Sequence, residues 1–269
     1  MNVKALIYKL IQSNTRLMNI YIYTVNKLSG GLFNLAGIKI RNNKIALLGE
    51  KNSINVRKDC SLQNTIMEVV GDGNMISIYE DSEFLGGSFR NIYIHGNNNS
   101  IVIEKGCKLT DVSFFIAGNN NQIHISENYS GIGVEFHIEQ NDNKVFIGKN
   151  TTMHGRGVKT VHFALDEGTK IIIGEDCMFS NDIQIRTSDS HSIVDLKGNR
   201  LNPAKDIIIG NHCWIGLRSM ILKGTEISDN TMVAGGSICT KKYLEKNVII
   251  AGNPAKMVKN NVNWDRKFL

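Results

Sequence analysis

One histidine of this sequence lies in a setting that suits proton transfer. His191 belongs to residues 186–193, which read Arg-Thr-Ser-Asp-Ser-His-Ser-Ile and surround it with hydroxyls and a carboxylate. An imidazole with an unperturbed pKa of about 6.5 exchanges protons near neutral pH, so it can serve as a general base. We interpret the other histidines as structural or merely exposed; they are His95, His124, His137, His154, His162 and His212.

The elements that must position His191 are predicted by a repeat near the C-terminus. Aliphatic or small residues recur there every six positions, namely Ile209, Ile215, Ile221, Ile227, Val233 and Cys239. Two residues before each stands a second, mostly small series: Ile207, Cys213, Ser219, Thr225, Thr231 and Ser237. A period of six fits neither an α-helix nor an ordinary strand. It predicts a parallel β-helix, in which each hexad forms one flat side, the aliphatic residue points inward and the small residue turns the corner.

The repeat continues upstream with a longer period. Equivalent aliphatic residues lie 22 positions apart, as in the pairs Val56 and Ile78, Ile103 and Ile125, and Ile125 and Ile147. Asparagine-rich runs separate these units at 97–99, 119–121 and 141–143. Asparagine tolerates the positive φ of tight turns, and its amide can stack on an identical neighbour. The upstream part is therefore predicted to be the same solenoid with asparagine-lined corners.

The segment with His191 interrupts the solenoid once. Ile185 and Ile209 are 24 residues apart, one hexad more than an 18-residue turn, and the sequence between them is polar. We predict a β-helix over residues 32–253 with a protruding loop at about 187–205. Functional residues often lie on loops that a rigid scaffold positions.

The two ends of the chain predict helical segments. Residues 1–28 have helical apolar spacing that stops at Ser29-Gly30-Gly31, so residues 1–31 are expected to form an amphipathic cap over the open end of the solenoid. Basic residues interrupt the apolar ones, which excludes a signal-peptide core or a membrane span. A helix resting on a membrane surface is the alternative. Residues 254–269 are expected to leave the coil as a short helical tail.

Composition limits the partners. The 269-residue chain carries a net charge of +6 without any Lys/Arg block longer than a pair. This diffuse charge favours anionic ligands, such as a nucleotide-phosphate cofactor or an acidic glycan, over nucleic acid. The five cysteines include no CxxC pair, and we interpret them as small buried residues of a reducing compartment.

Four motifs together carry a resemblance to a known family. They are residues 186–193, Cys-Trp-Ile-Gly at 213–216, Ala-Gly-Gly-Ser-Ile-Cys-Thr-Lys at 234–241, and Ile-Ala-Gly-Asn-Pro-Ala-Lys at 250–256. Their order and spacing resemble the left-handed β-helix (hexapeptide-repeat) acyltransferases over roughly residues 170–265. Within that family the chain is most similar to the O-acetyltransferases of bacterial capsular and other surface polysaccharides, including the polysialic acid O-acetyltransferases. The resemblance implies an all-β, left-handed parallel β-helix.

The same resemblance implies a mechanism. Such enzymes move an acetyl group from acetyl-CoA directly to an acceptor hydroxyl, here of a surface glycan, and His191 matches their catalytic base. Trp214 matches a tryptophan of the acceptor site, where an indole can stack on a sugar ring and donate one N–H. A role in lateral packing is the alternative for Trp214.

The cofactor residues implied by the resemblance are Gly235, Gly236, Ser237, Thr240, Lys241 and Lys256. The glycines would let the pantetheine arm approach the backbone, and the lysines would meet the phosphates. Where relatives have Ala-Gly-Ser, this chain has Gly-Gly-Ser. The family further implies a homotrimer with active sites between subunits and no metal. The expected location is the cytoplasm, with peripheral contact to the inner membrane through the N-terminal helix.

Other functions were weighed against this one. An N-acetyltransferase for an amino sugar nucleotide, or a small-molecule O-acetyltransferase for serine or a simple sugar, could use the same histidine. Metal enzymes of the γ-carbonic anhydrase type need an H-x-x-x-x-H element, and no two histidines here are five apart. A non-enzymatic adhesin or fibre would need neither the histidine loop nor the ending at 250–256.

Overall fold

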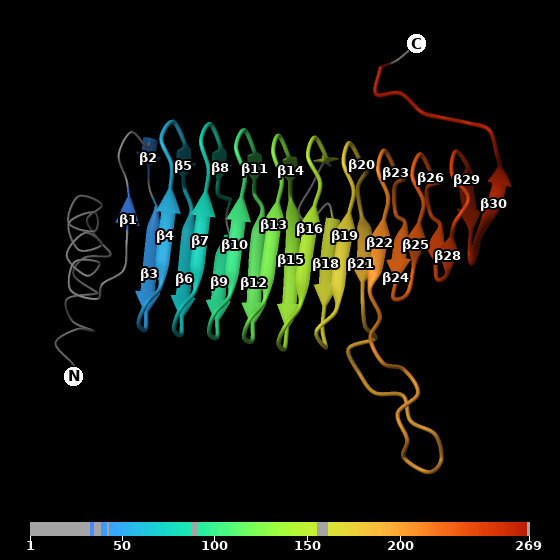
Figure 1. Ribbon diagram of the computed structural model, residues 1–269, viewed down its shortest axis with the longest axis horizontal. Helices are drawn as coiled ribbons and strands as arrows, with labels where there is room; N and C mark the ends of the chain where they lie inside the picture. The colour runs from blue at the N-terminus through green and yellow to red at the C-terminus, as the bar shows by residue number, and fades with distance from the viewer. Residues whose placement is uncertain (1–32, 35–38, 42, 88–90, 155–160, 268–269) are drawn as a thin grey trace.

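The computed structural model describes residues 33–34, 39–41, 43–87, 91–154 and 161–267. Within these ranges the regular elements are strands, β1 to β30, which pair into three sheets along one solenoid (Figure 1). The parallel β-helix predicted from the six-residue period is therefore confirmed, whereas its left hand stays a prediction from the resemblance.

Each sheet runs the length of the solenoid. Sheet A contains β1 (Phe33–Asn34), β4 (Ser53–Val56), β7 (Met75–Ile78), β10 (Ser100–Ile103), β13 (Gln122–Ile125), β16 (Lys144–Ile147), β19 (Lys170–Ile173), β22 (Ile207–Ile209), β25 (Glu226–Ile227) and β28 (Lys242–Tyr243). Sheet B contains β2 (Lys39–Arg41), β5 (Ser61–Gln63), β8 (Glu83–Leu85), β11 (Lys108–Thr110), β14 (Ser130–Ile132), β17 (Thr152–Met153), β20 (Met178–Phe179), β23 (Trp214–Ile215), β26 (Met232–Val233), β29 (Ile249–Gly252) and β30 (Ala255–Lys259). Sheet C contains β3 (Lys44–Leu48), β6 (Ile66–Val70), β9 (Ile92–His95), β12 (Ser113–Ala117), β15 (Val134–Glu139), β18 (Val161–Leu165), β21 (Ile183–Arg186), β24 (Met220–Leu222) and β27 (Ile238–Cys239).

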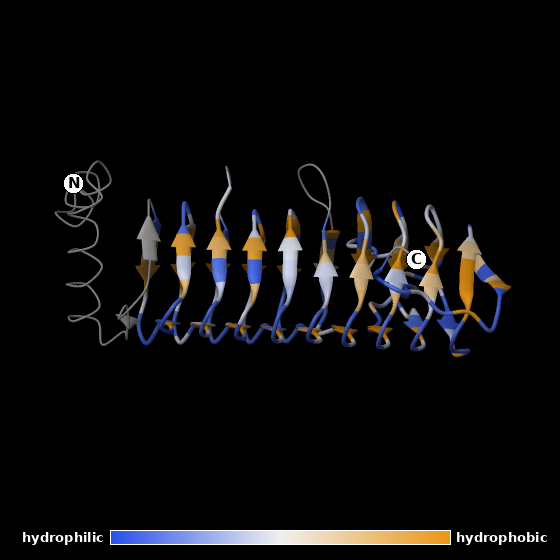
Figure 2. Ribbon diagram, turned by 90° about the horizontal axis from the view of Figure 1, so that it is seen from above, coloured by the Kyte–Doolittle hydropathy of each residue, from blue (hydrophilic) through white to orange (hydrophobic). Residues whose placement is uncertain are grey.

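The chain visits sheets A, B and C in turn, so neighbours within a sheet are one coil apart in sequence. Val56 pairs with Ile78 in the N-terminal part, at the step of 22 residues that also separates stacked asparagines. Ile209 pairs with Ile227 in the C-terminal part, at the step of 18 residues that the neighbouring corner contact repeats. The long period predicted upstream and the three-hexad period predicted downstream are thus both present in one continuous solenoid, whose rungs follow one another in Figure 2.

The interior is filled by the residues that the repeat placed there. The six aliphatic or small residues at 209, 215, 221, 227, 233 and 239 are all buried. In the wider coils, the rings of Phe114, Phe136 and Phe163 stack through sheet C with centroids 5.0 and 4.6 Å apart. Each buried ring removes enough apolar surface from water to contribute about 1.5–3 kcal/mol. The core therefore consists of ladders of like residues from successive coils.

An asparagine ladder seals one corner of the wide coils. Its members are buried and lie at 52, 74, 99, 121 and 143. Asn121 shows the pattern, because its Nδ2 donates to Asn99 Oδ1 over 3.1 Å and to the Gln140 carbonyl over 2.9 Å. Gly96 and Gly118 precede two of the exposed runs and allow close approach of the coils: Gly96 has φ 148°, and a Cβ there would lie 1.9 Å from the Gly118 carbonyl oxygen. Stacked amides and positive-φ corners were predicted, and both are confirmed.

The cysteines are also placed as predicted, as small buried residues. All five are free and buried. Burial raises the pKa of the Cys107 and Cys239 thiols to about 12, so both stay protonated at neutral pH. Cys213 follows Cys177 in the same corner ladder, and its backbone N–H lies 3.4 Å from the Cys177 Sγ.

Residues 187–206 leave the coil between β21 and β22 and project beyond the ends of the sheet C strands (Figure 1). Ile173 pairs with Ile209, so this coil takes a step of 36 residues, against 18 for the coil that follows it. The sequence count from Ile185 to Ile209 underestimated the insertion, because Ile185 belongs to sheet C and Ile209 to sheet A.

The predicted C-terminal helix is wrong. Ala255–Lys259 forms β30, which pairs antiparallel with β29, and residues 260–267 have no regular structure. The strand pairs with the backbone groups that β29 would otherwise expose at the last edge of sheet B. The predicted N-terminal helix, residues 1–31, lies outside the described residues. Among the residues that are described, no helix is long and apolar enough to span a membrane.

Candidate functional site

The root of the protruding loop is fixed by buried hydroxyls. Thr187 and Ser188 are buried immediately after β21. The Ser188 hydroxyl donates to Asp166 Oδ2 at the end of the neighbouring strand β18, and the Thr169 hydroxyl donates to the Thr187 hydroxyl over 2.7 Å. The loop therefore starts from a defined position on the solenoid, just before His191.

His191 is exposed, and its backbone is held by Asn202. Asn202 is only 8% exposed, although it lies in the returning arm of the loop. Its Nδ2 donates to the His191 carbonyl over 2.8 Å, and its Oδ1 accepts the N–H of Ile193 over 2.6 Å. This amide closes the loop around the imidazole-bearing residue. Sequence reasoning missed Asn202, because one asparagine in a polar stretch carries no periodic signal.

Charged pairs attach the loop to the coils on either side. Lys223 Nζ contacts Asp189 Oδ2, and this ammonium together with the Asn202 amide lowers the pKa of the Asp189 carboxyl. Arg200 donates to both carboxylate oxygens of Glu167, and its guanidinium lowers the pKa of that carboxyl. Both carboxylates are therefore charged at neutral pH, when these pairs hold the loop.

Trp214 lies on β23 and is 40% exposed. Its ring centroid is 6.1 Å from that of Trp264, with the rings tilted by 50°. Trp264 is buried, stacks on the imidazole of His212 at 4.3 Å and donates its Nε1–H to the His212 carbonyl over 2.9 Å. The tail after β30 thus places a second indole beside Trp214. The predicted helical tail gave no indication of this contact.

The glycine corner predicted to meet the cofactor joins β26 to β27. Gly235 and Gly236 are exposed, and nothing lies within 4 Å of a Cβ built on Gly236, whose φ is 72°. Ser237 is different, because it is fully buried. Its hydroxyl donates to the Ala234 carbonyl over 2.6 Å and accepts the N–H of Gly252 over 3.2 Å. The Ser237 side chain therefore supports the corner, and its contact with the cofactor stays a prediction.

The remaining predicted cofactor residues gather on the same last coils. Thr240 and Lys241 are exposed after β27, and the Lys241 Nζ lies 5.7 Å from the ring centroid of Tyr243. The Tyr243 hydroxyl donates to the Ala255 carbonyl over 3.1 Å. This bond and the one from Gly252 to the Ser237 hydroxyl hold the hairpin with exposed Lys256 against the corner.

The two predicted catalytic residues, His191 and Trp214, do not contact each other within the described part of one chain. The loop of His191 continues from a strand of sheet C, whereas Trp214 lies on sheet B. In Figure 1 the loop extends below the solenoid and β23 lies near its upper edge.

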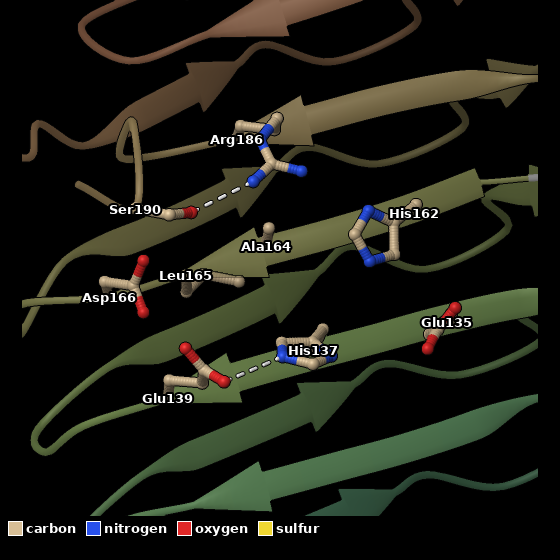
Figure 3. A pocket seen from close by; sticks show the side chains of 9 residues that line it. All are labelled: Glu135, His137, Glu139, His162, Ala164, Leu165, Asp166, Arg186 and Ser190. Carbon is tan, nitrogen blue, oxygen red and sulfur yellow. Dashed lines mark hydrogen bonds and ion pairs between the residues drawn. The ribbon is translucent and has the colours of Figure 1, made fainter.

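A hollow of about 370 Å³ opens on the outer face of sheet C beside the root of the loop. Its walls come from β15, β18, β21 and the loop (Figure 3), and consist of Glu135, His137, Glu139, His162, Ala164, Leu165, Asp166, Arg186 and Ser190. Arg186 Nη2 donates to the Ser190 hydroxyl over 3.1 Å, which links the hollow to the loop. Burial lowers the pKa of His162. His137 and His162 were expected to be structural or merely exposed, and no sequence pattern indicated this cluster.

Comparison of the sequence with known proteins identifies relatives. A polysialic acid O-acetyltransferase from Neisseria meningitidis is 40% identical over 174 residues, which cover 64% of this chain and 78% of that protein. A polysialic acid O-acetyltransferase from Escherichia coli O1:K1 / APEC is 37% identical over 120 residues, which cover 44% of this chain and 37% of that protein. No protein-family model matches the chain.

Solved structures extend the likeness over most of the solenoid. The polySia-specific acetyltransferase NeuO matches with a TM-score of 0.60 and 29% identity, over 84% of this chain and 90% of that chain. The polysialic acid O-acetyltransferase OatWY matches with a TM-score of 0.57 and 28% identity, over 86% of this chain and 92% of that chain. The chain forms a solenoid of hexads, and its match covers 78% of the relative from Neisseria meningitidis. The chain therefore belongs to the hexapeptide-repeat acetyltransferases, in the group of the polysialic acid O-acetyltransferases.

Proposed function

We propose that this enzyme transfers an acetyl group from acetyl-CoA to a hydroxyl of an acidic capsular polysaccharide, with polysialic acid as the first polymer to test. The observation that carries the proposal is the 40% identity to a polysialic acid O-acetyltransferase over 78% of that relative. The net charge of +6 supports an anionic polymer, because a basic protein attracts such a chain at long range.

His191 is the proposed general base. Its imidazole takes the proton of the acceptor hydroxyl while the oxygen attacks the thioester carbonyl carbon. The C–S bond then breaks, and the coenzyme A sulfur leaves with the proton that the imidazole returns. A general base typically contributes about 10²–10⁴ in rate. Asn202 and Ser188 act as positioning residues, because they fix the backbone on both sides of His191.

The donor is proposed to lie along the corner at Gly235 and Gly236. Exposed backbone at two successive glycines lets an extended pantetheine arm approach closely. Lys241 and Lys256 stand on the same coils with exposed ammonium groups, which suit the phosphates of coenzyme A. Thr240 offers a hydroxyl beside them. Trp214, with Trp264 behind it, is proposed to contact the acceptor sugar, because an indole stacks on a sugar ring.

A homotrimer, which the family resemblance implies, is proposed; it agrees with the position of His191 and Trp214 on different sheets of one chain. An active site between two copies would pair the loop of one with the glycine corner of the next. The returning arm of the loop supports this assembly. Leu201 N donates to the Ile193 carbonyl over 2.8 Å, and the resulting small hairpin exposes aliphatic side chains at 193, 194, 196 and 201. Such a patch is expected to be covered by another surface.

The location follows from the donor. Because the proposed reaction consumes acetyl-CoA, we expect the enzyme in the cytoplasm, where capsule precursors or nascent polymer at the inner membrane would be within reach.

The test compares acceptors one at a time. Purified enzyme and acetyl-CoA are incubated separately with polysialic acid, an amino sugar nucleotide, serine and a simple sugar, and thiol release is followed together with the mass of the product. We expect the parent enzyme to form an ester on the polymer. The His191→Ala variant should not catalyse this reaction. Turnover confined to the amino sugar nucleotide or to serine would replace the proposed acceptor, although the acyl transfer itself would stand.

A further inference from the structure

Three side chains with metal-binding atoms meet on the outer face of sheet C. Glu135 and His162 are directly paired across β15 and β18, and His137 stands two residues beyond Glu135 on the same face. One ligand atom from each lies within 4.8 Å of the others, and all three side chains are half-buried. In Figure 3 they stand on neighbouring strands, on the same face of the sheet.

The hydrogen bonds around the cluster leave one nitrogen of each imidazole available. The Oε1 of Gln184 can only accept a hydrogen bond, so the His162 Nδ1 that lies 3.0 Å from it carries the proton. The lone pair of His162 is then on Nε2. In the same way, His137 Nε2 donates to Glu139 Oε1 over 3.2 Å, which leaves the lone pair on Nδ1. An imidazole whose other nitrogen donates to an oxygen acceptor is the usual arrangement of a metal-bound histidine.

We propose that Glu135, His137 and His162 form a binding site for a divalent transition-metal ion, Zn²⁺ in the first place. Two imidazoles and one carboxylate are ligands that zinc accepts at about 2.0–2.2 Å, with a fourth position open to water or to an anion. Ligand atoms that share one zinc ion at about 2.0–2.2 Å lie closer together than 4.8 Å, so the three side chains would draw together when the ion binds. The open position would face the hollow that also contains Arg186.

This site is separate from the proposed acetyl transfer, which uses no metal. Its expected effect on the molecule is a bridge between β15 and β18, next to the strand from which the His191 loop departs. The proposal can therefore be tested by binding alone, whatever the acceptor of the enzyme is.

The experiment measures Zn²⁺ binding by calorimetry to the full chain, freed of any histidine tag and stripped of metal with a chelator. We expect one zinc ion per chain and an affinity at least about tenfold weaker in His137→Ala, His162→Ala and Glu135→Gln. Gln184→Leu removes only the partner of His162 and should weaken binding by about tenfold. Co²⁺ in place of Zn²⁺ should give visible absorption of a four- or five-coordinate ion in the parent protein that is lost in the variants.

His124→Ala is the matched control, because His124 is an outer-face histidine whose Nε2 lies 3.4 Å from Glu104 Oε1, on sheet A. It should bind zinc like the parent protein. All variants replace half-buried side chains outside the core, and far-UV circular dichroism verifies that those compared are folded. Absence of zinc binding at micromolar concentrations, or equal binding by the parent and the folded Glu135 and His162 variants, would overturn the proposal.

Discussion

The wide coils of the N-terminal part and the tight coils of the C-terminal part differ in length and in the residues that form their corners. Between β4 and β16 most coils repeat after 22 residues, the step from Asn99 to Asn121, and the sheet C strand β15 reaches 6 residues. From β22 to β27 the coils repeat after 18 residues, the step from Asn211 to Asp229, and their strands are short. The wide coils stabilise a corner with stacked buried amides, whereas the tight coils turn on small residues and glycine.

The wide coils use their corner residues to stabilise the fold, whereas the tight coils present the residues predicted to bind and react. The asparagine ladder uses its polar groups within the solenoid, so they are not offered to a ligand. The corner at Gly235 and Gly236 instead leaves backbone exposed. Every predicted site residue lies in the tight coils, in the hairpin after them or in the loop that precedes them. The hollow on sheet C marks the transition between the two regions.

The largest expected loss of stability comes from a charge placed in the interior of a wide or a tight coil. Ile221→Asp in a tight coil and Ile123→Asp in a wide coil each place a carboxylate on a fully buried inward position, which costs several kcal/mol. We expect both variants to be insoluble or unfolded by circular dichroism, whereas Ile208→Asp on the exposed outer face of β22 should fold. A soluble Ile221→Asp variant with an unchanged melting temperature would contradict the inward register of the tight coils.

The second effect is confined to chemistry. His191→Ala should lower turnover by about 10²–10⁴ without changing the melting temperature, since the exposed imidazole is outside both kinds of coil. Steady-state kinetics and thermal unfolding measure the two quantities, and Ser192→Ala serves as the neighbouring control. Turnover within a few fold of the parent enzyme would remove His191 from the mechanism.

The third effect tests the wide coils alone. Asn121→Ala leaves buried partners of the ladder without a hydrogen bond, which should lower the free energy of unfolding by about 1–3 kcal/mol. Asn119→Ala removes the side-chain bonds with Asn97 and Asn141 in the exposed ladder of the same corner, and should cost less because water replaces them. Urea unfolding compares them; equal losses would mean that burial is not what makes the inner ladder stabilising.

The smallest effect is electrostatic. The folded-state pKa of Asp189 is lowered by Lys223, so the pair stabilises the loop above the unfolded pKa of about 3.9, and this contribution is lost as pH falls through the lower folded value. Lys223→Met should raise the pKa of Asp189 toward its ordinary value, as followed by NMR of the carboxyl carbon. An unchanged titration would assign the shift to the Asn202 amide instead.

The sequence predicted the solenoid well because its core is periodic. Ile209 to Cys239 could be assigned to the interior from spacing alone, and the asparagine corners followed from turn chemistry. Contacts between coils were beyond that reasoning. His137 and His162 lie on successive coils, and their separation in sequence has no meaning until the length of that coil is known. Trp264 likewise acts through His212, which is distant in sequence. Asn202 is one asparagine in a polar stretch, and the pairing of residues 255–259 with β29 has no periodic signal either.

The constant register of the parallel ladders makes the wide region modular. Ser100 pairs with Gln122 and Met75 in equivalent positions, and the strands of the next two faces continue the same pairing. Since each coil contacts only its neighbours, residues 100–121 form a cassette whose loss would bring matching surfaces together. The scaffold can therefore change length in whole coils during evolution or engineering, while the loop and the tight coils keep their geometry.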